Sequence, residues 1–307
     1  EQDLADLRLY SDPEGTALRA KLAELYGVEA GQVFLSNGSD DILNFAFMAF
    51  GADGAVFPAL TYSFYPVFAN LHGVAYETVP LREDFTLDVA GMQGKGKLTV
   101  FPNPNAPTGI ALPLDQVEAI VAANPDHVVV VDEAYVDFGA DSAVPLLQRY
   151  ENLLVVMTYS KSRSMAGARL GFALGSRALI QDLEKLKYST NPYNVNRLTL
   201  KLGQAAVDSD GYFREKAREI MATREKTAQA LRALGFTLPD SQANFLFVTH
   251  PKVAGETLYR KCKEKGVLIR HFSDPAIAAY NRVTIGTPAE MEAFLAVVQT
   301  ILKEEGA

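Results

Sequence analysis

The chain has 307 residues, of which 48% are hydrophobic and 21% are charged, and its formal net charge is −8 at pH 7. This composition is typical of a globular protein with a large core, and the length suggests two domains. An acidic chain without a basic stretch is unsuited to nucleic acid, and no apolar run approaches the length that crosses a membrane, so we expect neither partner.

Cysteine and histidine usage narrows the chemistry further. Cys262 is the single cysteine. It cannot form an internal disulfide, which fits the reducing cytoplasm, where we expect the protein. The four histidines are scattered without the spacing of metal ligands, so we predict no metal site.

Up to about residue 180, predicted helices alternate with short apolar strands. Residues 17–26 have the pattern of an amphipathic helix, and residues 33–35 that of a strand. A glycine turn then leads into an apolar helix over 42–50, with Ser39 or Asp40 as its natural N-cap. The other predicted elements are a helix at 114–123 and strands at 55–57, 98–101, 128–131, 153–157 and 169–174.

Several of these strands are continuous apolar runs, such as Val128 to Val131. Strands of that kind are buried on both faces, which indicates a largely parallel sheet with helical crossovers. We therefore predict an α/β fold whose mostly parallel sheet is sandwiched by helices, followed by a smaller α/β region. Its predicted elements are a long charged helix over 212–234, strands at 245–248, 267–269 and 282–285, and a final helix opened by a capping box at 287–290.

Polar clusters follow three predicted strands at the points where they end. They are residues 103–109 after Phe101, residues 132–135 after Val131, and Ser160 with Lys161 after Met157. Ligands of open parallel sheets bind outside the carboxyl ends of the strands. An amine, a carboxylate, a phenol and an amide would therefore meet in one crevice, which indicates a functional site rather than packing.

These groups suit pyridoxal phosphate. Lys161 would be partly desolvated, which favours the neutral amine, and would form a Schiff base with the aldehyde and then carry the α-proton. Asp132 would pair with the pyridine nitrogen and keep it protonated. Tyr135 and Asn105 are candidates for hydrogen bonds to the phenolic oxygen. Taken singly, each residue has a plainer interpretation, such as a surface lysine or a capping aspartate, and their convergence is what favours the cofactor.

The phosphate of such a cofactor also has candidate partners. Gly38, Ser39 and Asp40 lie at a predicted helix N-terminus, whose backbone N–H groups bind anions. The guanidinium of Arg169 would grip the same phosphate. Two neighbouring side chains supply further hydroxyl donors, Thr158 and Ser160.

With these residues in place, the chain resembles the aspartate-aminotransferase-like, fold-type I pyridoxal-phosphate enzymes, and most closely their histidinol-phosphate aminotransferase branch. The resemblance covers nearly all 307 residues. The spacing from Lys161 to Arg169 and the Asp-x-x-Tyr motif are its most specific parts. The matching segments are 35–41, 61–62, 103–109, 132–138, 160–169 and 282–287.

The resemblance alone implies further roles. Tyr62 matches the aromatic residue that stacks over the cofactor ring. Tyr10 matches a tyrosine that reaches the cofactor phosphate of the neighbouring subunit in a homodimer. Arg282 matches the arginine that binds the substrate's carboxylate or phosphate, with Arg270 as a second candidate for the same anion.

The expected domains are an N-terminal arm and helix in residues 1–27 that contribute to the small domain and the dimer contact, a large cofactor-binding domain in 28–205, and a small domain in 206–307. Two features depart from the family. Ala106 stands where the family has asparagine, so Asn105 becomes the candidate for the ring-oxygen contact. The family's Asn-Glu-Asn-Pro-like stretch, which lines the substrate pocket, is not found ahead of Glu1.

The implied activity is an aminotransferase reaction in two halves. Glutamate would give its amino group to the cofactor and leave as 2-oxoglutarate, and the amino group would then pass to imidazole acetol phosphate, giving histidinol phosphate. Three alternatives stay open at this stage. They are an aminotransferase for aromatic or other amino acids, a decarboxylase related to the threonine-phosphate decarboxylases, and a pyridoxal-phosphate-binding sensor domain of a transcription regulator.

Overall fold

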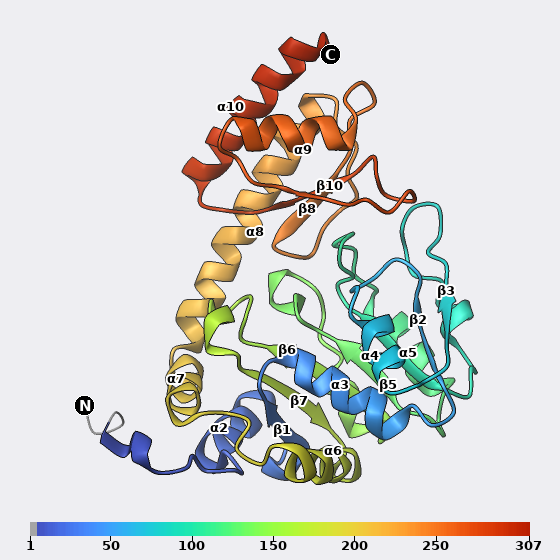
Figure 1. The fold of residues 1–307 in the computed structure, drawn as a ribbon, viewed down its shortest axis with the longest axis vertical. Coiled ribbons are helices and arrows are strands. Elements are labelled where there is room, and N and C mark those ends of the chain that lie inside the picture. Colours follow the sequence, from blue (N-terminus) through green and yellow to red (C-terminus); the bar gives the residue numbers. More distant parts are fainter. Residues whose placement is uncertain (1–4) are drawn as a thin grey trace.

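A seven-stranded sheet forms the centre of the larger part of the molecule, and a second sheet of three strands lies beyond it (Figure 1). Both belong to a computed structural model that describes residues 5–307. The large sheet has the order β1-β7-β6-β5-β4-β2-β3. Its strands are β1 (Val33–Ser36), β2 (Ala55–Pro58), β3 (Tyr76–Val79), β4 (Leu98–Pro102), β5 (Val129–Asp132), β6 (Leu153–Thr158) and β7 (Gly171–Gly175).

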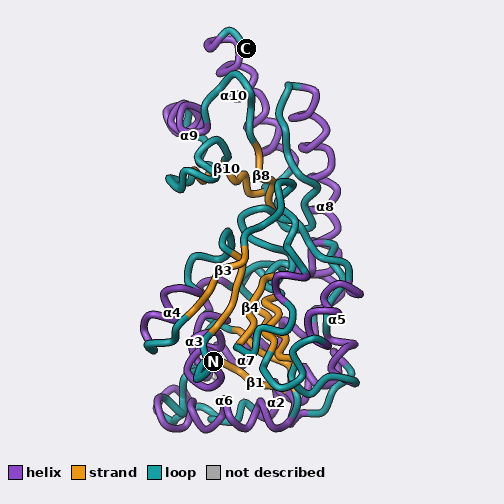
Figure 2. The backbone as a smooth tube through the Cα atoms, turned by 90° about the vertical axis from the view of Figure 1, so that its right-hand side faces the viewer, coloured by secondary structure: helices purple, strands orange, loops and turns teal. Residues whose placement is uncertain are grey.

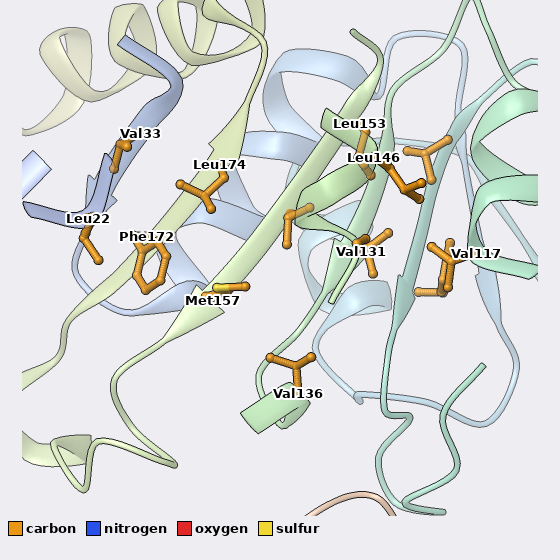
Figure 3. Close-up of a cluster of buried hydrophobic side chains, with 14 of the residues drawn as sticks. Leu22, Val33, Val117, Val131, Val136, Leu146, Leu153, Met157, Phe172 and Leu174 are labelled. Carbon is orange, nitrogen blue, oxygen red and sulfur yellow. The ribbon is translucent and has the colours of Figure 1, made fainter. Parts of the chain in front are cut away.

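Five neighbouring strands, from β6 to β3, run parallel, whereas β7 is antiparallel to both β6 and β1. Successive side chains enter different clusters, as expected for strands buried on both faces. Val129 and Val131 pack in one hydrophobic cluster and Val130 in another. Figure 3 shows part of the first cluster, where Leu22, Val131 and other side chains meet beside the strands. The predicted α/β sandwich is confirmed.

Helices cover both faces of the large sheet (Figure 2). Buried residues of α2, α5 and α7 belong to the first cluster, and those of α3, α4 and α6 to the second. The bounds are α2 (Thr16–Tyr26), α3 (Ser39–Phe50), α4 (Tyr65–Leu71), α5 (Leu114–Ala122), α6 (Arg177–Thr190) and α7 (Arg197–Asp208).

The sequence reading missed α4, β3, α6 and α7. Two of these helices carry recognisable starts, because the side chains of Ser176 and Asn196 accept hydrogen bonds from the N–H groups of Leu179 and Thr199. Their polar outer faces dilute the apolar pattern. Ser176 and Asn196 are favourable N-cap residues, and they were the signal in the sequence that could have located α6 and α7.

The long helix α8 (Asp210–Ala233) runs from the large sheet to the second sheet, as Figure 1 shows. The second sheet is antiparallel with the order β8-β10-β9 and packs against α8, α9 and α10. The bounds are β8 (Phe245–Val248), α9 (Gly255–Glu264), β9 (Arg270–His271), β10 (Asn281–Thr284) and α10 (Pro288–Glu305). The predicted capping box is present, with Thr287 as N-cap and Glu290 as its partner.

Two expectations for these regions differ from the structure. The strand expected at 267–269 does not form, because the N–H of Val267 bonds back to the Cys262 carbonyl and Leu268 is exposed, so pairing with β10 is limited to β9. Helix α2, expected to contribute to the small domain, instead packs its Leu18 and Leu22 into the first cluster of the large sheet. The domain boundaries stay a prediction.

None of the helices described over residues 5–307 is long and apolar enough to cross a membrane.

A close backbone contact holds β7 against the turn before α3. A Cβ added at Gly171 would lie 2.4 Å from the backbone carbon of Gly38 and 2.5 Å from the backbone nitrogen of Ser39. Backbone atoms cannot move aside as a flexible side chain can. Only glycine therefore lets this strand and this turn come together.

We expect Gly171→Ala to lower the free energy of unfolding by about 1–3 kcal/mol, because the added methyl group forces the strand and the turn apart. Gly167→Ala is the matched control, since no atom of residues 5–307 lies within 4 Å of a Cβ there. It should change the free energy by no more than about 0.5 kcal/mol. Urea unfolding of both variants tests this, and equal midpoints would contradict it.

Candidate active site

The carboxyl ends of β4, β5 and β6 lie side by side, because these strands are parallel neighbours in register. A cavity opens there, between the strand ends and the start of α3. Its lining residues are Ser39, Asp40, Tyr62, Pro102, Ala106, Asp132, Ala134, Tyr135, Thr158, Ser160, Lys161, Ala166 and Arg169. Nine of these side chains are ones that the sequence analysis singled out as cofactor ligands.

Lys161 lies just beyond β6, in the loop that returns to β7. Its Nζ is 5.3 Å from the centre of the Tyr135 ring, so the amine and the phenol from two neighbouring strand ends share one wall of the cavity. The preceding turn is held by hydrogen bonds. Thr158 Oγ1 donates to Ser160 Oγ over 3.0 Å and accepts from the Ser160 N–H over 3.1 Å.

Asp132, the last residue of β5, is only 5% exposed. Burial raises the pKa of this carboxyl to about 6, although two hydrogen bonds oppose the rise. The hydroxyl of Tyr65 donates to Oδ2 over 2.9 Å, and the N–H of Ala134 donates to Oδ1 over 3.2 Å. Each oxygen thus has one protein donor and keeps lone pairs for a ligand.

The sequence reading missed the contact between Tyr65 and Asp132. The sequence analysis assigns no role to Tyr65, whose hydroxyl partner is 67 positions away in the chain. The available signal was a tyrosine inside an otherwise apolar stretch, because a buried phenol needs a hydrogen-bond partner.

An anion-binding arrangement lies at the N-terminus of α3. The N-cap is Gly38, with φ 80°, rather than Ser39 or Asp40 as we expected, and no side chain of the described residues caps the helix. The first N–H groups of α3 are therefore available to an anion, and the helix dipole favours one there. A Cβ at Gly38 would lie 2.6 Å from Nη2 of Arg169, so the glycine lets the guanidinium approach.

Arg169 adopts the left-handed conformation, with φ 53°, which is costly for a residue with a side chain. Its Nη2 lies 3.1 Å from Oδ2 of Asp40. The other oxygen of Asp40 accepts a 2.8 Å hydrogen bond from the Tyr62 hydroxyl. Burial is the main cause that raises the pKa of Tyr62 well above its usual value, and this hydrogen bond raises it further. The phenol therefore stays protonated.

Asn105 is placed differently from our expectation. It does not line this cavity, and Ala106 does. The amide of Asn105 donates to the carbonyl of Leu60 and to Oγ1 of Thr108, and it lines a separate small pocket beside Ile110. One of these bonds closes the turn after β4, and the other joins that turn to the segment after β2. The contact between Asn105 and the ring oxygen stays a prediction.

The two substrate arginines lie on the second sheet. Arg282 and Arg270 are directly opposite each other on β10 and β9. The guanidinium of Arg282 lies 5.0 Å from the centre of the Phe245 ring, which itself meets Tyr135 edge to face at 5.1 Å. Arg282 is thus one aromatic ring away from the cavity. Like charges directly opposite each other repel, and an anion between them would relieve the repulsion.

Tyr10 lies outside the cavity of its own chain. It is 77% exposed and stacks on Tyr193, with ring centres 4.4 Å apart. The guanidinium of Arg197 also donates to the Tyr10 carbonyl over 2.9 Å. Among the described residues, Tyr10 is not part of the cavity that holds Lys161, so any contact with a cofactor would have to be with that of another subunit.

The donor set fits pyridoxal phosphate. It provides an amine for the aldehyde at Lys161, a buried carboxylate for the ring nitrogen at Asp132, and a helix N-terminus with Arg169 for the phosphate. Tyr62 offers an aromatic face. Within residues 5–307, no group of three or more His, Cys, Asp or Glu side chains is arranged to hold a metal ion.

Comparisons with known proteins agree with this chemistry. Residues 1–298 match the family model described as aminotransferase class I and II. The chain is 46% identical to a histidinol-phosphate aminotransferase of Brachyspira hyodysenteriae, over 99% of this chain and 86% of that protein. It is 50% identical to histidinol-phosphate aminotransferase 1 of Bordetella parapertussis, over 96% of this chain and 84% of that protein.

Solved structures share the fold at lower identity. A histidinol-phosphate aminotransferase from Sinorhizobium meliloti, in complex with pyridoxal-5'-phosphate, has a TM-score of 0.89 and 24% identity, covering 99% of this chain and 85% of that one. An L-threonine-O-3-phosphate decarboxylase from Porphyromonas gingivalis has a TM-score of 0.86 and 21% identity, covering 98% and 93%. Because both reactions occur on one fold, the sequence relatives carry the assignment. The chain belongs to the class I and II aminotransferases, as a histidinol-phosphate aminotransferase homologue that uses pyridoxal phosphate.

Proposed function

We propose that the protein exchanges an amino group between histidinol phosphate and 2-oxoglutarate, giving imidazole acetol phosphate and glutamate. The observation that carries this proposal is the meeting of Lys161, Asp132 and Arg169 around one cavity. The names of the sequence relatives supply the substrate. The site residues below are proposals of the same kind.

Bound pyridoxal phosphate supplies an electron sink for breaking the bond to the substrate's α-hydrogen. Asp132 would place a negative charge beside the ring nitrogen and would so keep a proton on that nitrogen. Lys161 would hold the cofactor through its aldehyde and would take and return the α-proton, and its Nζ lies beside the Tyr135 ring at the end of the neighbouring strand. The hydroxyl of Tyr135 would orient the cofactor ring by a hydrogen bond to the ring's phenolic oxygen.

The phosphate would lie at the start of α3, where Gly38, Ser39 and Asp40 offer backbone N–H groups. Arg169 would exchange its Asp40 partner for the phosphate, a stronger bidentate partner. Two hydroxyls on the same side of the cavity complete the set, those of Thr158 and Ser160. The ring of Tyr62 would stack on the cofactor.

The substrate's anionic group would be held by Arg282, with Arg270 as its neighbour. One guanidinium can bind the carboxylate of glutamate or the phosphate of histidinol phosphate, because its planar fork matches both anions. The Nε of Arg282 is buried without a hydrogen-bond partner among the described residues, which supports a ligand there.

We further propose a cytoplasmic homodimer in which Tyr10 reaches the neighbouring cavity, and a division into a large domain over 28–205 and a small domain over 206–307. The exposure of Tyr10 supports the first point. Sedimentation velocity of the purified protein tests the dimer, and a purely monomeric species would contradict it.

Product analysis separates this function from its competitors. The protein, loaded with pyridoxal phosphate, is incubated with histidinol phosphate and 2-oxoglutarate, and the glutamate formed is measured. Parallel incubations contain phenylalanine with 2-oxoglutarate, or threonine phosphate alone. We expect glutamate from histidinol phosphate at a kcat/KM at least about tenfold above that from phenylalanine. A reversed preference would favour an aromatic aminotransferase, CO₂ release a decarboxylase, and no turnover a sensor domain.

Removal of the proposed nucleophile tests the role of Lys161. We expect Lys161→Ala to lower kcat by at least about a thousandfold, because both the covalent bond and the proton carrier are lost. Lys185→Ala is the matched control, since this lysine is exposed on α6 and pairs with Asp182. It should keep the full rate. Similar rates for the two variants would refute the active-site assignment.

Removal of the proposed phosphate ligand tests the role of Arg169. We expect Arg169→Ala to weaken retention of pyridoxal phosphate on the order of tenfold or more, because a charge-assisted bond is lost. The measurement is cofactor remaining after equilibrium dialysis. Arg177→Ala, which removes an exposed ion pair with Glu29, is the control and should retain cofactor as the unaltered chain does. Equal losses would exclude a phosphate contact at Arg169.

A further inference from the structure

Tyr65 lies at the first position of α4 and is fully buried, but its hydroxyl makes a specific hydrogen bond. It donates to Oδ2 of Asp132 over 2.9 Å. The ring meets Tyr62 edge to face at 5.7 Å and also contacts Phe57. Tyr65 therefore reaches Asp132 from behind the cavity wall, and it is absent from the residues that line the cavity.

We propose that Tyr65 is a positioning residue, whose hydroxyl fixes the Asp132 carboxylate for its bond to the cofactor's ring nitrogen. This inference rests on the proposed function. The N–H of Ala134 holds Oδ1 and Tyr65 holds Oδ2, so the carboxylate cannot rotate without breaking one of the two bonds. Its remaining lone pairs then point in fixed directions.

The same hydrogen bond keeps the carboxylate charged. Burial favours the neutral acid, and the bond from Tyr65 is the largest influence that lowers the pKa of Asp132. The other charged groups near this carboxyl act in both directions. Asp40 on α3 raises the pKa, and Lys161 beyond β6 lowers it. Glu133, the next residue in the chain, is a further buried acid beside it.

The pH dependence follows from these positions. Without the Tyr65 hydroxyl, the pKa of Asp132 should rise above its value of about 6. A carboxyl whose pKa is higher in the folded than in the unfolded chain stabilises the fold at low pH, and that stabilisation is lost as the pH rises through the folded value. The loss therefore extends to higher pH in Tyr65→Phe than in the unaltered chain.

Tyr159 offers a matched control. It is a second buried tyrosine, the residue after β6, 2% exposed, and its hydroxyl has no hydrogen-bond partner among the described residues. Tyr159→Phe therefore removes the same atom from a similar environment without touching Asp132. Both phenylalanine variants keep the ring and its packing.

The experiment compares Tyr65→Phe, Tyr159→Phe and the unaltered chain in two measurements. The first is the retention of pyridoxal phosphate in equilibrium dialysis at pH 7.5. We expect Tyr65→Phe to bind the cofactor on the order of tenfold more weakly, because a bond to a charged group is lost, and Tyr159→Phe to bind it unchanged. The second is the thermal midpoint of the cofactor-free protein between pH 5 and pH 8, which should fall more steeply for Tyr65→Phe alone.

Asp132→Asn supplies the second test. If the hydroxyl acts through the charge of Asp132, adding Tyr65→Phe to Asp132→Asn should not change the pH dependence further. The double variant also keeps the test valid if Tyr65→Phe alone folds poorly, because the double variant should fold as well as Asp132→Asn does. A double variant that folds less well than Asp132→Asn would overturn the inference. Equal behaviour of the two phenylalanine variants would overturn it as well. Absence of cofactor binding by the unaltered chain would instead overturn the proposed function, and this inference with it.

Discussion

The negative charge kept inside the protein at Asp132 is the constraint on which the rest of the site depends. A buried carboxylate is unfavourable unless it is hydrogen-bonded, and here a tyrosine and a backbone N–H supply the bonds. The two donors come from α4 and from the turn after β5. The strand end, the helix and the turn must therefore keep their relative positions for the charge to persist.

That requirement explains why the site is built on the centre of the sheet. Strands β4, β5 and β6 are buried on both faces, and their neighbours hold them in register. Loops that begin at such strands start from fixed points, so Lys161 and Tyr135 meet although they are 26 positions apart. The second sheet then closes over the site through Phe245, which contacts Tyr135.

Most of this site could be predicted from the sequence, because many of its residues follow strands that are recognisable as apolar runs. Lys161 and Asp132 were located in this way, and Arg169 by its guanidinium and its spacing from Lys161. Asn105 does not line the cavity, and its amide instead donates to the carbonyl of Leu60, far back in the chain. Tyr65 was overlooked for a similar reason. A hydroxyl on a helix whose partner lies on a distant strand leaves no local pattern, and only the fold brings the two together.

The ion pair between Arg169 and Asp40 has a consequence for what the site can bind. An anion that enters must displace a carboxylate already in place, so its affinity is the difference between two ion pairs rather than the full strength of one. An anion with no other contact gains little from that exchange. A ligand that also reaches Asp132 and the Tyr62 ring adds further contacts to the balance. The number of simultaneous contacts therefore determines which anions occupy the site. A simple ion competes poorly with the carboxylate of Asp40 for Arg169.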